Sequence, residues 1–390
     1  MATESVVLLE GAKGQLVDYD LGALLQEQNV CDVSLGFGGK ASLSNFRKIG
    51  FITTDKYEIE IRPKVKIAGL LQLLDTDLRA FEQLNRVSQL DDSEDWTHAL
   101  GVFFALQLEK AVARGPLEGY VETSSWERTI RGRIQFSRLA VSSWQASPEL
   151  PLEFDEYSMD IPENIIVNTA LEILSRNFRL SDRVRKMLLN GRSKLKDVSI
   201  LRPGAAIPPY SVTPLNSHYQ ALLGTSELII RSQSIAASRG NRVAGSFLID
   251  MARLFESYLE LYFAKLSRNH DLDFRPQKGN QHLDEGQLFR IRPDYLWFRG
   301  GHATALADAK YKVISTKTDI SNADINQVIA YCSRFGLEEG HLIFPEAPEF
   351  TSIMTNSSLK VTVHKVDLSL DQAGLSANVE RVFRKIVKLP

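Results

Sequence analysis

The chain has 390 residues, of which 44% are hydrophobic, so it holds enough apolar material for more than one packed core. Its formal net charge is −2, which excludes a protein coated in basic surface of the kind that scans DNA alone through phosphate contacts. A role on nucleic acid would therefore need either a local groove or a partner that holds the nucleic acid.

Three features of the sequence indicate the cellular location of the protein. The first ten residues lack a basic segment followed by an apolar stretch, so no signal peptide is predicted. No apolar run approaches the ~20 residues of a membrane-spanning helix. Cys31 and Cys332 are far apart and form no C-x-x-C motif. We expect a cytoplasmic protein with no membrane association, no disulfide framework and no structural zinc site.

Residues 1–160 are predicted to form a β-rich N-terminal domain that also contains helices. Short strands are expected at 6–9, 46–52 and 57–61, and the last alternates cleanly. Helices should follow at 68–74 and 95–114, the second of them largely buried. We expect this domain to be the one that binds a partner.

Three arginines, Arg128, Arg131 and Arg133, lie within six residues between Trp126 and Phe136. Their pattern leaves the charges on the surface, where they could contact a DNA backbone or a protein partner. The alternative is a strand edge blunted by charge, which is common in β-proteins.

Residues 161–235 are predicted to be a helical connector. Pro162 suits the first turn of a helix over 165–178, and a basic helix follows at 182–189. A cluster of prolines from 203 to 214 indicates a long connection. The polar stretch at 232–242 either closes over DNA or serves as a linker into a C-terminal domain at 236–390.

The C-terminal domain shows the order helix, hairpin, helix, strand. An amphipathic helix is predicted over 246–262, and apolar runs at 295–298 and 303–307 flank a Gly-Gly turn. A second helix at 324–335 precedes a strand at 341–344. This order describes an α/β layer built on a mixed sheet.

Two carboxylates and a lysine, Asp294, Asp308 and Lys310, are the strongest candidates for chemistry. Folding back at the Gly-Gly turn brings Asp308 beside Asp294, and alternation along the strand puts Asp308 and Lys310 on one face. Two clustered carboxylates are a natural seat for a hard divalent cation. A lysine beside them can orient or deprotonate a water and offset phosphate charge.

Other readings of these residues stay open. An Asp-x-Lys on an exposed strand is usually a solvated face, and Arg290, Arg292 or Lys312 could neutralise the acids in place of a metal. Glu256, on the first predicted helix, is either a third metal ligand or an ordinary exposed residue. Gln327 lies four residues before Tyr331 and so shares a helix face with it, from which the pair could bind a phosphate or the lysine.

The Pro-Asp of 293–294 and the Asp-x-Lys of 308–310 resemble the PD-(D/E)xK nuclease superfamily, and the Gln-x-x-x-Tyr pair resembles its RecB-like branch. Further segments resemble McrC proteins, the nuclease subunits of the McrBC system that restricts modified DNA such as 5-methylcytosine DNA. These segments lie at 58–65, 130–136, 154–164 and 247–256. The tail at 358–390 continues past the last strand that the resemblance covers.

The resemblance implies a fold and a site. The fold would be α/β (α+β overall), with a β-rich N-terminal domain and helices followed by a C-terminal restriction-endonuclease-like mixed sheet flanked by helices. Asp294 and Asp308 would hold Mg²⁺, and Lys310 would complete the site. The resemblance assigns site roles to Gln327 and Glu256 less strongly.

The resemblance also implies partners: double-stranded DNA and a ring-forming AAA+ GTPase that translocates on DNA. In that family the nuclease subunit lacks its own nucleotide site and stimulates hydrolysis by the ring. This sequence agrees, since it contains no G-x-x-x-x-G-K-[S/T] phosphate loop.

Three hypotheses follow. The leading one is a Mg²⁺-dependent endonuclease subunit recruited by a GTP-driven ring. The second is a catalytically idle adaptor that regulates an AAA+ ring. The third is a ring-independent repair nuclease closer to the RecB-like branch, against which the matching segments before residue 165 count.

Overall fold

The computed structural model describes residues 4–11, 14–74, 95–141, 149–178, 180–233, 243–276, 281–355 and 358–389. Contacts within the chain group it into two compact units, one of Met1–Glu94 with Ala236–Pro390 and the other of Asp95–Ile235. This grouping differs from the expected segments 1–160, 161–235 and 236–390. Residues 95–160 pack with the helical connector, and the N-terminal residues pack with the C-terminal segment.

The N-terminal part of the first unit contains two sheets. The larger sheet has the order β1-β6-β5-β10, in which β1 and β6 run parallel and the other neighbours run antiparallel. Its strands are β1 (Glu4–Leu9), β5 (Lys48–Thr54), β6 (Tyr57–Arg62) and β10 (Val243–Asp250). The smaller sheet and its helix consist of β2 (Gln15–Val17), α1 (Tyr19–Glu27), β3 (Asp32–Leu35), a 3₁₀ turn (Phe37–Gly39) and β4 (Ala41–Ser44).

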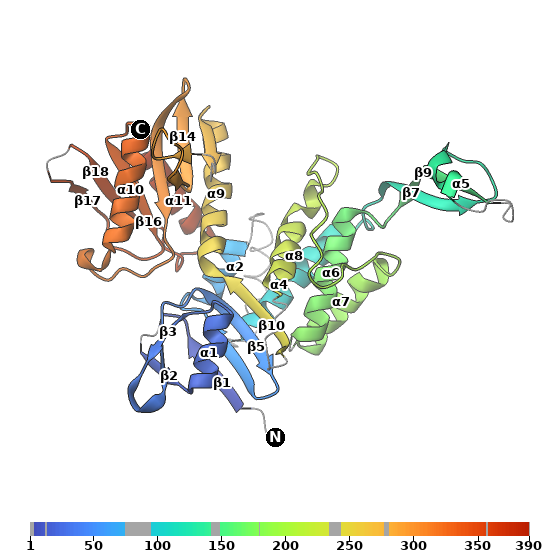
Figure 1. Ribbon diagram of the computed structural model, residues 1–390, viewed down its shortest axis with the longest axis horizontal. Helices are drawn as coiled ribbons and strands as arrows, with labels where there is room; N and C mark the ends of the chain where they lie inside the picture. Colours follow the sequence, from blue (N-terminus) through green and yellow to red (C-terminus); the bar gives the residue numbers. More distant parts are fainter. Residues whose placement is uncertain are drawn as a thin grey trace. The chain divides into compact units, whose positions relative to one another are not determined.

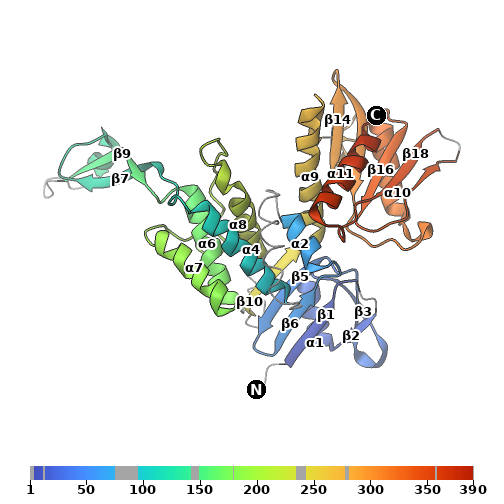
Figure 2. The ribbon, with the colours of Figure 1, turned by 180° about the vertical axis from the view of Figure 1, so that it is seen from behind.

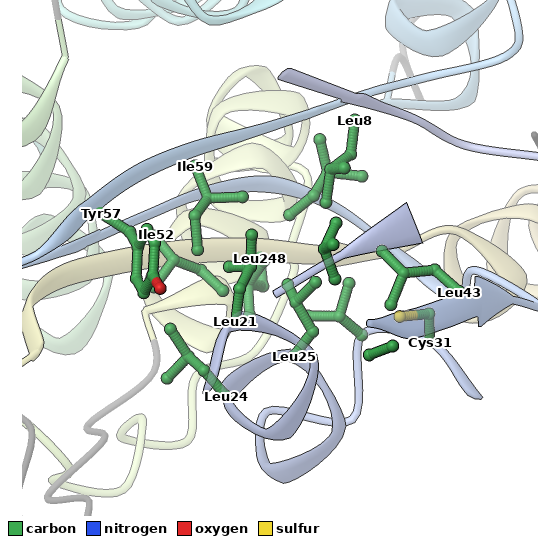
Figure 3. Close-up of a cluster of buried hydrophobic side chains, with 14 residues drawn as sticks. Leu8, Leu21, Leu24, Leu25, Cys31, Leu43, Ile52, Tyr57, Ile59 and Leu248 are labelled. Carbon is green, nitrogen blue, oxygen red and sulfur yellow. The ribbon is translucent and has the colours of Figure 1, made fainter. Parts of the chain in front are cut away.

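An apolar core fills the space between the larger sheet and α1. Ile59 and Ile61 of β6 are fully buried there, as the alternation of that segment predicts. Leucines of α1 and Leu248 of β10 close the same cluster (Figure 3). Residues more than 180 positions apart in the sequence therefore share one core, which explains why 243–250 belongs with the N-terminal strands.

Gly50 is required where β5 meets β10. Its φ is +148°, and a Cβ atom at this position would lie 1.9 Å from the carbonyl oxygen of Phe247. Only glycine permits this approach of the two backbones without a shift of one strand.

The predicted start of the C-terminal helix is wrong. Residues 246–250 belong to β10, and the helix α9 spans Met251–Asn269. β5 offers an open edge to this apolar, β-prone segment, and the Asp250 side chain then accepts the backbone N–H of Arg253 as the helix cap.

A mixed six-stranded sheet forms the C-terminal part of the first unit, in the order β11-β14-β15-β16-β18-β17. β15, β16 and β18 run parallel, and the remaining pairs run antiparallel. The strands are β11 (Asp273–Pro276), β14 (Tyr295–Arg299), β15 (His302–Ala309), β16 (Glu339–Phe344), β17 (Phe350–Ile353) and β18 (Lys360–Lys365). A short ladder of β12 (Gln281–His282) and β13 (Arg290–Ile291) precedes β14.

Helices cover both faces of this sheet. The helix α10 (Asn322–Phe335) packs on β15, β16 and β18. The helices α9 and α11 (Gln372–Ile386) pack together on the opposite face (Figures 1 and 2). The tail at 358–390 thus supplies a sheet strand and a covering helix. A short helix α2 (Ile67–Leu74) contacts α9, and a 3₁₀ turn spans Lys317–Asp319.

The second unit is a helical bundle that carries a β-hairpin. Its helices are α4 (Trp96–Ala111), α6 (Pro162–Asn177), α7 (Asp182–Lys194) and α8 (Gln220–Ser232), with a 3₁₀ turn at Ser217–Tyr219. The hairpin pairs β7 (Gly119–Glu127) with β9 (Leu150–Ser158), and β8 (Arg133–Ile134) and α5 (Phe136–Val141) lie near its tip. The hairpin extends away from the helices of its own unit (Figure 1).

Together these elements confirm the predicted α/β class with a β-rich N-terminal part and a helix-flanked mixed sheet at the C-terminus. No helix in the described ranges is long and apolar enough to cross a membrane.

Candidate active site

The β14–β15 hairpin sets the position of the two acids. Gly300 and Gly301 form its turn with φ of +57° and +82°, a conformation that glycine adopts at little cost. Tyr295 then pairs with Ala307 across the ladder. Asp294 and Asp308 each lie one residue beyond this pair, so they face each other at the same end of the hairpin.

The structure brings the three predicted residues together. Asp294 Oδ2 accepts the backbone N–H of Ala309 at 2.9 Å. Lys310 Nζ lies 2.5 Å from Asp308 Oδ2, and Asp308 is only 1% exposed. The backbone N–H of Lys310 donates to the carbonyl of Ile343 at 2.8 Å, which ties the lysine to the neighbouring parallel strand.

Burial and mutual repulsion disturb the charges of this site. Burial, followed by the charges of Asp308 and Glu256, raises the pKa of Asp294 to about 8. Burial also raises the pKa of Asp308, although the Lys310 ammonium works against this. For Lys310, burial lowers the pKa, but the attraction of Asp308 and neighbouring carboxylates outweighs it and holds the pKa above its ordinary value. The acids therefore lack the positive charge that would ionise them both at neutral pH.

A divalent cation fits this pair of acids. Asp308 Oδ2 is buried and, despite the nearby ammonium, has no hydrogen bond of acceptable geometry within the described part of the chain. The same ranges contain no group of three or more His, Cys, Asp or Glu side chains arranged to hold a metal. The two aspartates would thus be the protein ligands, and water or phosphate would complete the shell, as suits Mg²⁺.

Glu256 lies on α9 near the two aspartates without forming a three-carboxylate group with them. The phenol of Tyr295 donates to the Glu256 carbonyl at 2.8 Å and so fixes this turn of α9 beside Asp294. Burial raises the pKa of Glu256, which Lys310 lowers and Asp308 raises. The Glu256 side chain is half-buried, so it is not an ordinary exposed helix residue. Its role as a third metal ligand stays a prediction.

Gln327 and Tyr331 share a face of α10, as their spacing predicts. Gln327 Nε2 donates to the Tyr331 hydroxyl at 2.7 Å, and that hydroxyl donates to the Arg292 carbonyl at 3.3 Å. The pair thus holds the backbone two residues before Asp294. Its predicted contact with a phosphate or with Lys310 is not among these bonds.

Asp324 is a charged residue near the site that the sequence analysis overlooked. It is 6% exposed, its backbone N–H is capped by Ser321, and its carboxylate binds Lys312 Nζ at 2.8 Å. Lys312, one of the suggested neutralising partners of the aspartates, is therefore engaged elsewhere. The Asp324 charge also raises the pKa of both Asp308 and Lys310. The sequence signal for Asp324 was an acidic residue in the first turn of a predicted helix, three residues after Ser321.

The three arginines of 128–133 lie on the hairpin of the second unit. Arg128 pairs with Glu149 at 3.4 Å, and Arg131 pairs with Glu127 at 2.9 Å. The Arg131 guanidinium also lies 3.7 Å from the centre of the Phe154 ring. These surface pairs are weak and can exchange for a partner's charges, so a contact role stays a prediction.

The same hairpin exposes large apolar side chains. Their exposed fractions are 76% for Tyr120, 64% for Ile130, 72% for Phe136 and 59% for Tyr157. The rings of Tyr120 and Tyr157 lie 5.3 Å apart on adjacent strands. A hairpin with this surface and little packing of its own is typical of a segment that binds another molecule.

The segment 154–164 has a structural role near the base of this hairpin. Asp160 accepts from the backbone N–H and the hydroxyl of Ser199, both at 2.7 Å. Asn164 is fully buried, and its amide donates to the carbonyls of Leu117 and Met159. These residues fix α6 against the strands that lead into and out of the hairpin.

Comparisons with known proteins agree with this organisation. Residues 45–345 match the family described as "McrBC 5-methylcytosine restriction system component". The comparison with curated proteins gives no match.

Two solved structures from Thermococcus gammatolerans are similar to the chain. The first is a refined half-complex from a tetradecameric assembly of McrB AAA+ hexamers with bound McrC; the similarity has a TM-score of 0.55 at 16% identity and covers 98% of this chain and 100% of that one. The second is a cryo-EM structure of the McrBC complex, with a TM-score of 0.42 at 17% identity over 68% of this chain and 88% of that one.

The first of these similarities shows a shared fold along the whole chain. The family match spans β5 and β6, the β7–β9 hairpin and the candidate site, and together with the similarity to the structure that contains McrC it confirms the resemblance to McrC proteins. This chain belongs to the McrBC family of 5-methylcytosine restriction system components.

Proposed function

We propose that this chain is the metal-dependent DNA endonuclease subunit of a GTP-driven, modification-dependent restriction complex. It cleaves phosphodiester bonds in double-stranded DNA when assembled with a McrB-like AAA+ GTPase ring, and it stimulates GTP hydrolysis by that ring. The observation that carries the proposal is that Asp294, Asp308 and Lys310 meet at the end of one hairpin, where the Lys310 ammonium pairs with Asp308 and the pKa of Asp294 is raised to about 8.

The chemistry follows from these three side chains. Asp294 and Asp308 would hold Mg²⁺, which when bound supplies Lewis-acid stabilisation of phosphate charge and acidifies water. The ammonium of Lys310, which pairs with Asp308 in this structure, would orient an attacking water and offset the charge that develops on the phosphate. The apolar strands beneath the acids keep the site rigid, since Leu296 and Leu306 are fully buried.

The ring partner is supported by the fold and by the surface of the second unit. The structure with the TM-score of 0.55 contains McrC bound to McrB AAA+ hexamers. The sequence has no phosphate loop of its own and a net charge of only −2, so a partner that holds the DNA is consistent with it. We assign partner binding to the β7–β9 hairpin, a narrower region than residues 1–160. A cytoplasmic location stays a prediction.

Plasmid cleavage tests the proposal. The protein is incubated with its candidate GTPase partner, Mg²⁺, GTP and either modified or unmodified plasmid, and Asp308→Ala runs in parallel. We expect cleavage that requires the partner, GTP and modification, and a loss of at least about 1,000-fold in the variant, which has lost one of two metal ligands. Cleavage retained by a nuclease-free Asp308→Ala preparation would rule out this site.

One observation favours a second candidate, a catalytically idle adaptor of an AAA+ ring. Within the described ranges the site has two carboxylates rather than a ready-made group of three donors, and Lys310 already neutralises one of them. Under this hypothesis the chain raises the GTPase rate of the ring, no cleavage is seen with any metal, and Asp308→Ala changes neither property.

A further inference from the structure

The segment 58–65 resembles its family counterparts, but the cleavage chemistry does not use it. The fold explains where its end lies. β1 and β6 are parallel neighbours, with Leu9 beside Arg62, and the backbone N–H of Glu10 donates to the Arg62 carbonyl at 2.9 Å. Glu10 and Lys64 therefore emerge together at the carboxyl ends of two adjacent strands.

Tyr311 lies at this same end of the N-terminal sheet. Its hydroxyl donates to Glu10 Oε2 at 3.4 Å, and Lys64 Nζ lies 4.1 Å from the centre of its ring. The backbone N–H of Lys64 donates to the same carboxylate oxygen at 3.1 Å. We call Glu10, Lys64 and Tyr311 the buried triad. Its three members come from the N-terminal strands and from the segment that follows β15.

The buried triad lowers the stability of the fold, which indicates a role other than packing. The Glu10 side chain is fully buried, and its Oε1 has no hydrogen bond from any described residue; the closest ammonium, that of Lys64, is 3.9 Å away. A buried carboxylate in such surroundings is usually less favourable than an apolar side chain of similar size. Burial also lowers the pKa of Lys64, so both charges are held at a cost.

Tyr311 directly follows the candidate catalytic lysine. β15 ends at Ala309, so Asp308 lies within the strand and Lys310 lies just beyond its end. A tight turn follows, in which the N–H of Lys312 donates to the Lys310 carbonyl at 2.8 Å. The Tyr311 ring is 6.0 Å from that of Phe255, the residue before Glu256 on α9. The orientation of the Lys310 backbone is thus set from two sides, by the sheet and by the anchored Tyr311 ring.

We infer that the buried triad is a positioning device, through which the N-terminal sheet holds Lys310 in the orientation needed for cleavage. Glu10 and Tyr311 do not touch the substrate. They act through Lys310, and the inference therefore rests on the proposed nuclease function. Because small displacements of a reacting group reduce rates steeply, the loss of one anchoring hydrogen bond should lower kcat rather than DNA binding.

Single-turnover and steady-state cleavage by the assembled complex test this inference. Tyr311→Phe removes only the hydroxyl. Glu10→Leu replaces the carboxylate acceptor with an apolar side chain of similar size. Each variant should lower kcat by roughly tenfold or more with KM unchanged. The double variant should fall no further than either single variant, because both break the same hydrogen bond. Glu10→Gln, whose amide oxygen can still accept from Tyr311, should restore most of the rate.

Two readouts separate positioning from mere support of the fold. The thermal midpoint of Tyr311→Phe should fall little, because this variant removes only one long hydrogen bond, and its Mg²⁺ affinity should stay that of the wild type. Tyr19→Phe, at a tyrosine that is 62% exposed on α1, is the matched control with no expected effect. An unchanged kcat in Tyr311→Phe, or a loss that only parallels a lower thermal midpoint, would overturn the inference while leaving the nuclease function intact. Failure of the wild-type complex to cleave at all would overturn both.

Discussion

The candidate catalytic end of the β14–β15 hairpin and the surface of the β7–β9 hairpin depart in opposite ways from the usual distribution of side chains, in which charged groups are exposed and apolar groups are buried. The first buries charge: Asp308 is 1% exposed, and the pKa of Asp294 is about 8 because of burial and the neighbouring acids. The second exposes apolar rings, with Phe136 at 72% and Tyr120 at 76%. Both hairpins pair antiparallel strands, but β14 and β15 lie within a six-stranded sheet covered by helices, whereas β7 and β9, among the described residues, pair only with each other and with the short β8.

Each of these two features indicates a binding partner. Buried carboxylates are stabilised by a cation, and exposed rings are stabilised by another apolar surface. The comparison therefore predicts two separable activities in one chain, with cleavage at the first hairpin and ring binding at the second. Variants of either hairpin should remove one activity and preserve the other.

Lys310→Met is expected to separate cleavage from ring binding by the largest factor. Methionine keeps the length and apolar contacts of the lysine stem but removes the ammonium that offsets phosphate charge, so cleavage should fall by roughly 1,000-fold. GTPase stimulation should stay unchanged. The measurement is single-turnover cleavage of modified plasmid together with the GTPase rate of the ring.

Lys360→Met is the matched control for this variant, because Lys360 lies exposed on β18 of the same sheet. It should cleave at the wild-type rate. Equal losses in cleavage and GTPase stimulation by Lys310→Met would contradict the division between the two hairpins.

The double variant Tyr120→Ser and Tyr157→Ser is expected to have a smaller effect, on ring binding instead of on cleavage chemistry. The two rings are exposed and lie 5.3 Å apart on the hairpin surface, so their loss should leave the thermal midpoint nearly unchanged. Binding to the ring should weaken by roughly 30-fold, since exposed aromatic side chains often dominate interfaces. Affinity is measured by titration of the ring, and GTPase stimulation should return at saturating protein.

A matched change elsewhere in the second unit controls for the general loss of apolar surface. Leu189→Ser on α7 removes a leucine that is 56% exposed away from the hairpin, and it should bind the ring normally. The hairpin assignment fails if this variant binds as weakly as the tyrosine pair.

The two hairpins also differ in how far the sequence predicts them. Asp294, Asp308 and Lys310 could be placed together because a Gly-Gly turn between two apolar runs fixes the register, and register follows from local geometry. The β7–β9 hairpin was not predicted as such, since its strands are separated by 22 residues and β7, with the sequence GYVETSSWE, has too few apolar residues to show a strong hydrophobic alternation.

Long-range pairing explains the other differences from prediction. Residues 246–250 have apolar residues compatible with a helix, yet the open edge of β5 makes them a strand. The contact of Tyr311 with Glu10 joins residues 301 positions apart, and no local pattern reports such a contact. The sequence thus predicted that Asp294, Asp308 and Lys310 lie close together, which the structure shows, but not the distant residues that hold them; their catalytic role stays a prediction.

The smallest effect is expected from Asp294→Asn, and it tests whether the buried charge is costly without metal. The pKa of Asp294 is about 8 in the folded protein, against an ordinary value near 3.8 in an unfolded chain. Between these values the folded state binds more protons, so rising pH destabilises it, and the whole cost is present above pH 8. Because Asp308 shares the repulsion, we expect Asn to raise the free energy of unfolding by about 1 kcal/mol at pH 9 and by much less at pH 5.

Urea unfolding in EDTA at pH 5, 7 and 9 measures this difference, and repetition with Mg²⁺ completes the test. The asparagine can still accept the Ala309 N–H, so the backbone geometry is preserved. Mg²⁺ should stabilise the wild type more than the variant and so reverse their order, because only the wild type offers two carboxylates to the cation. A variant that is less stable than the wild type at pH 9 in EDTA would show that Asp294 is a satisfied structural acid, and the contrast between the two hairpins would then rest on the exposed rings alone.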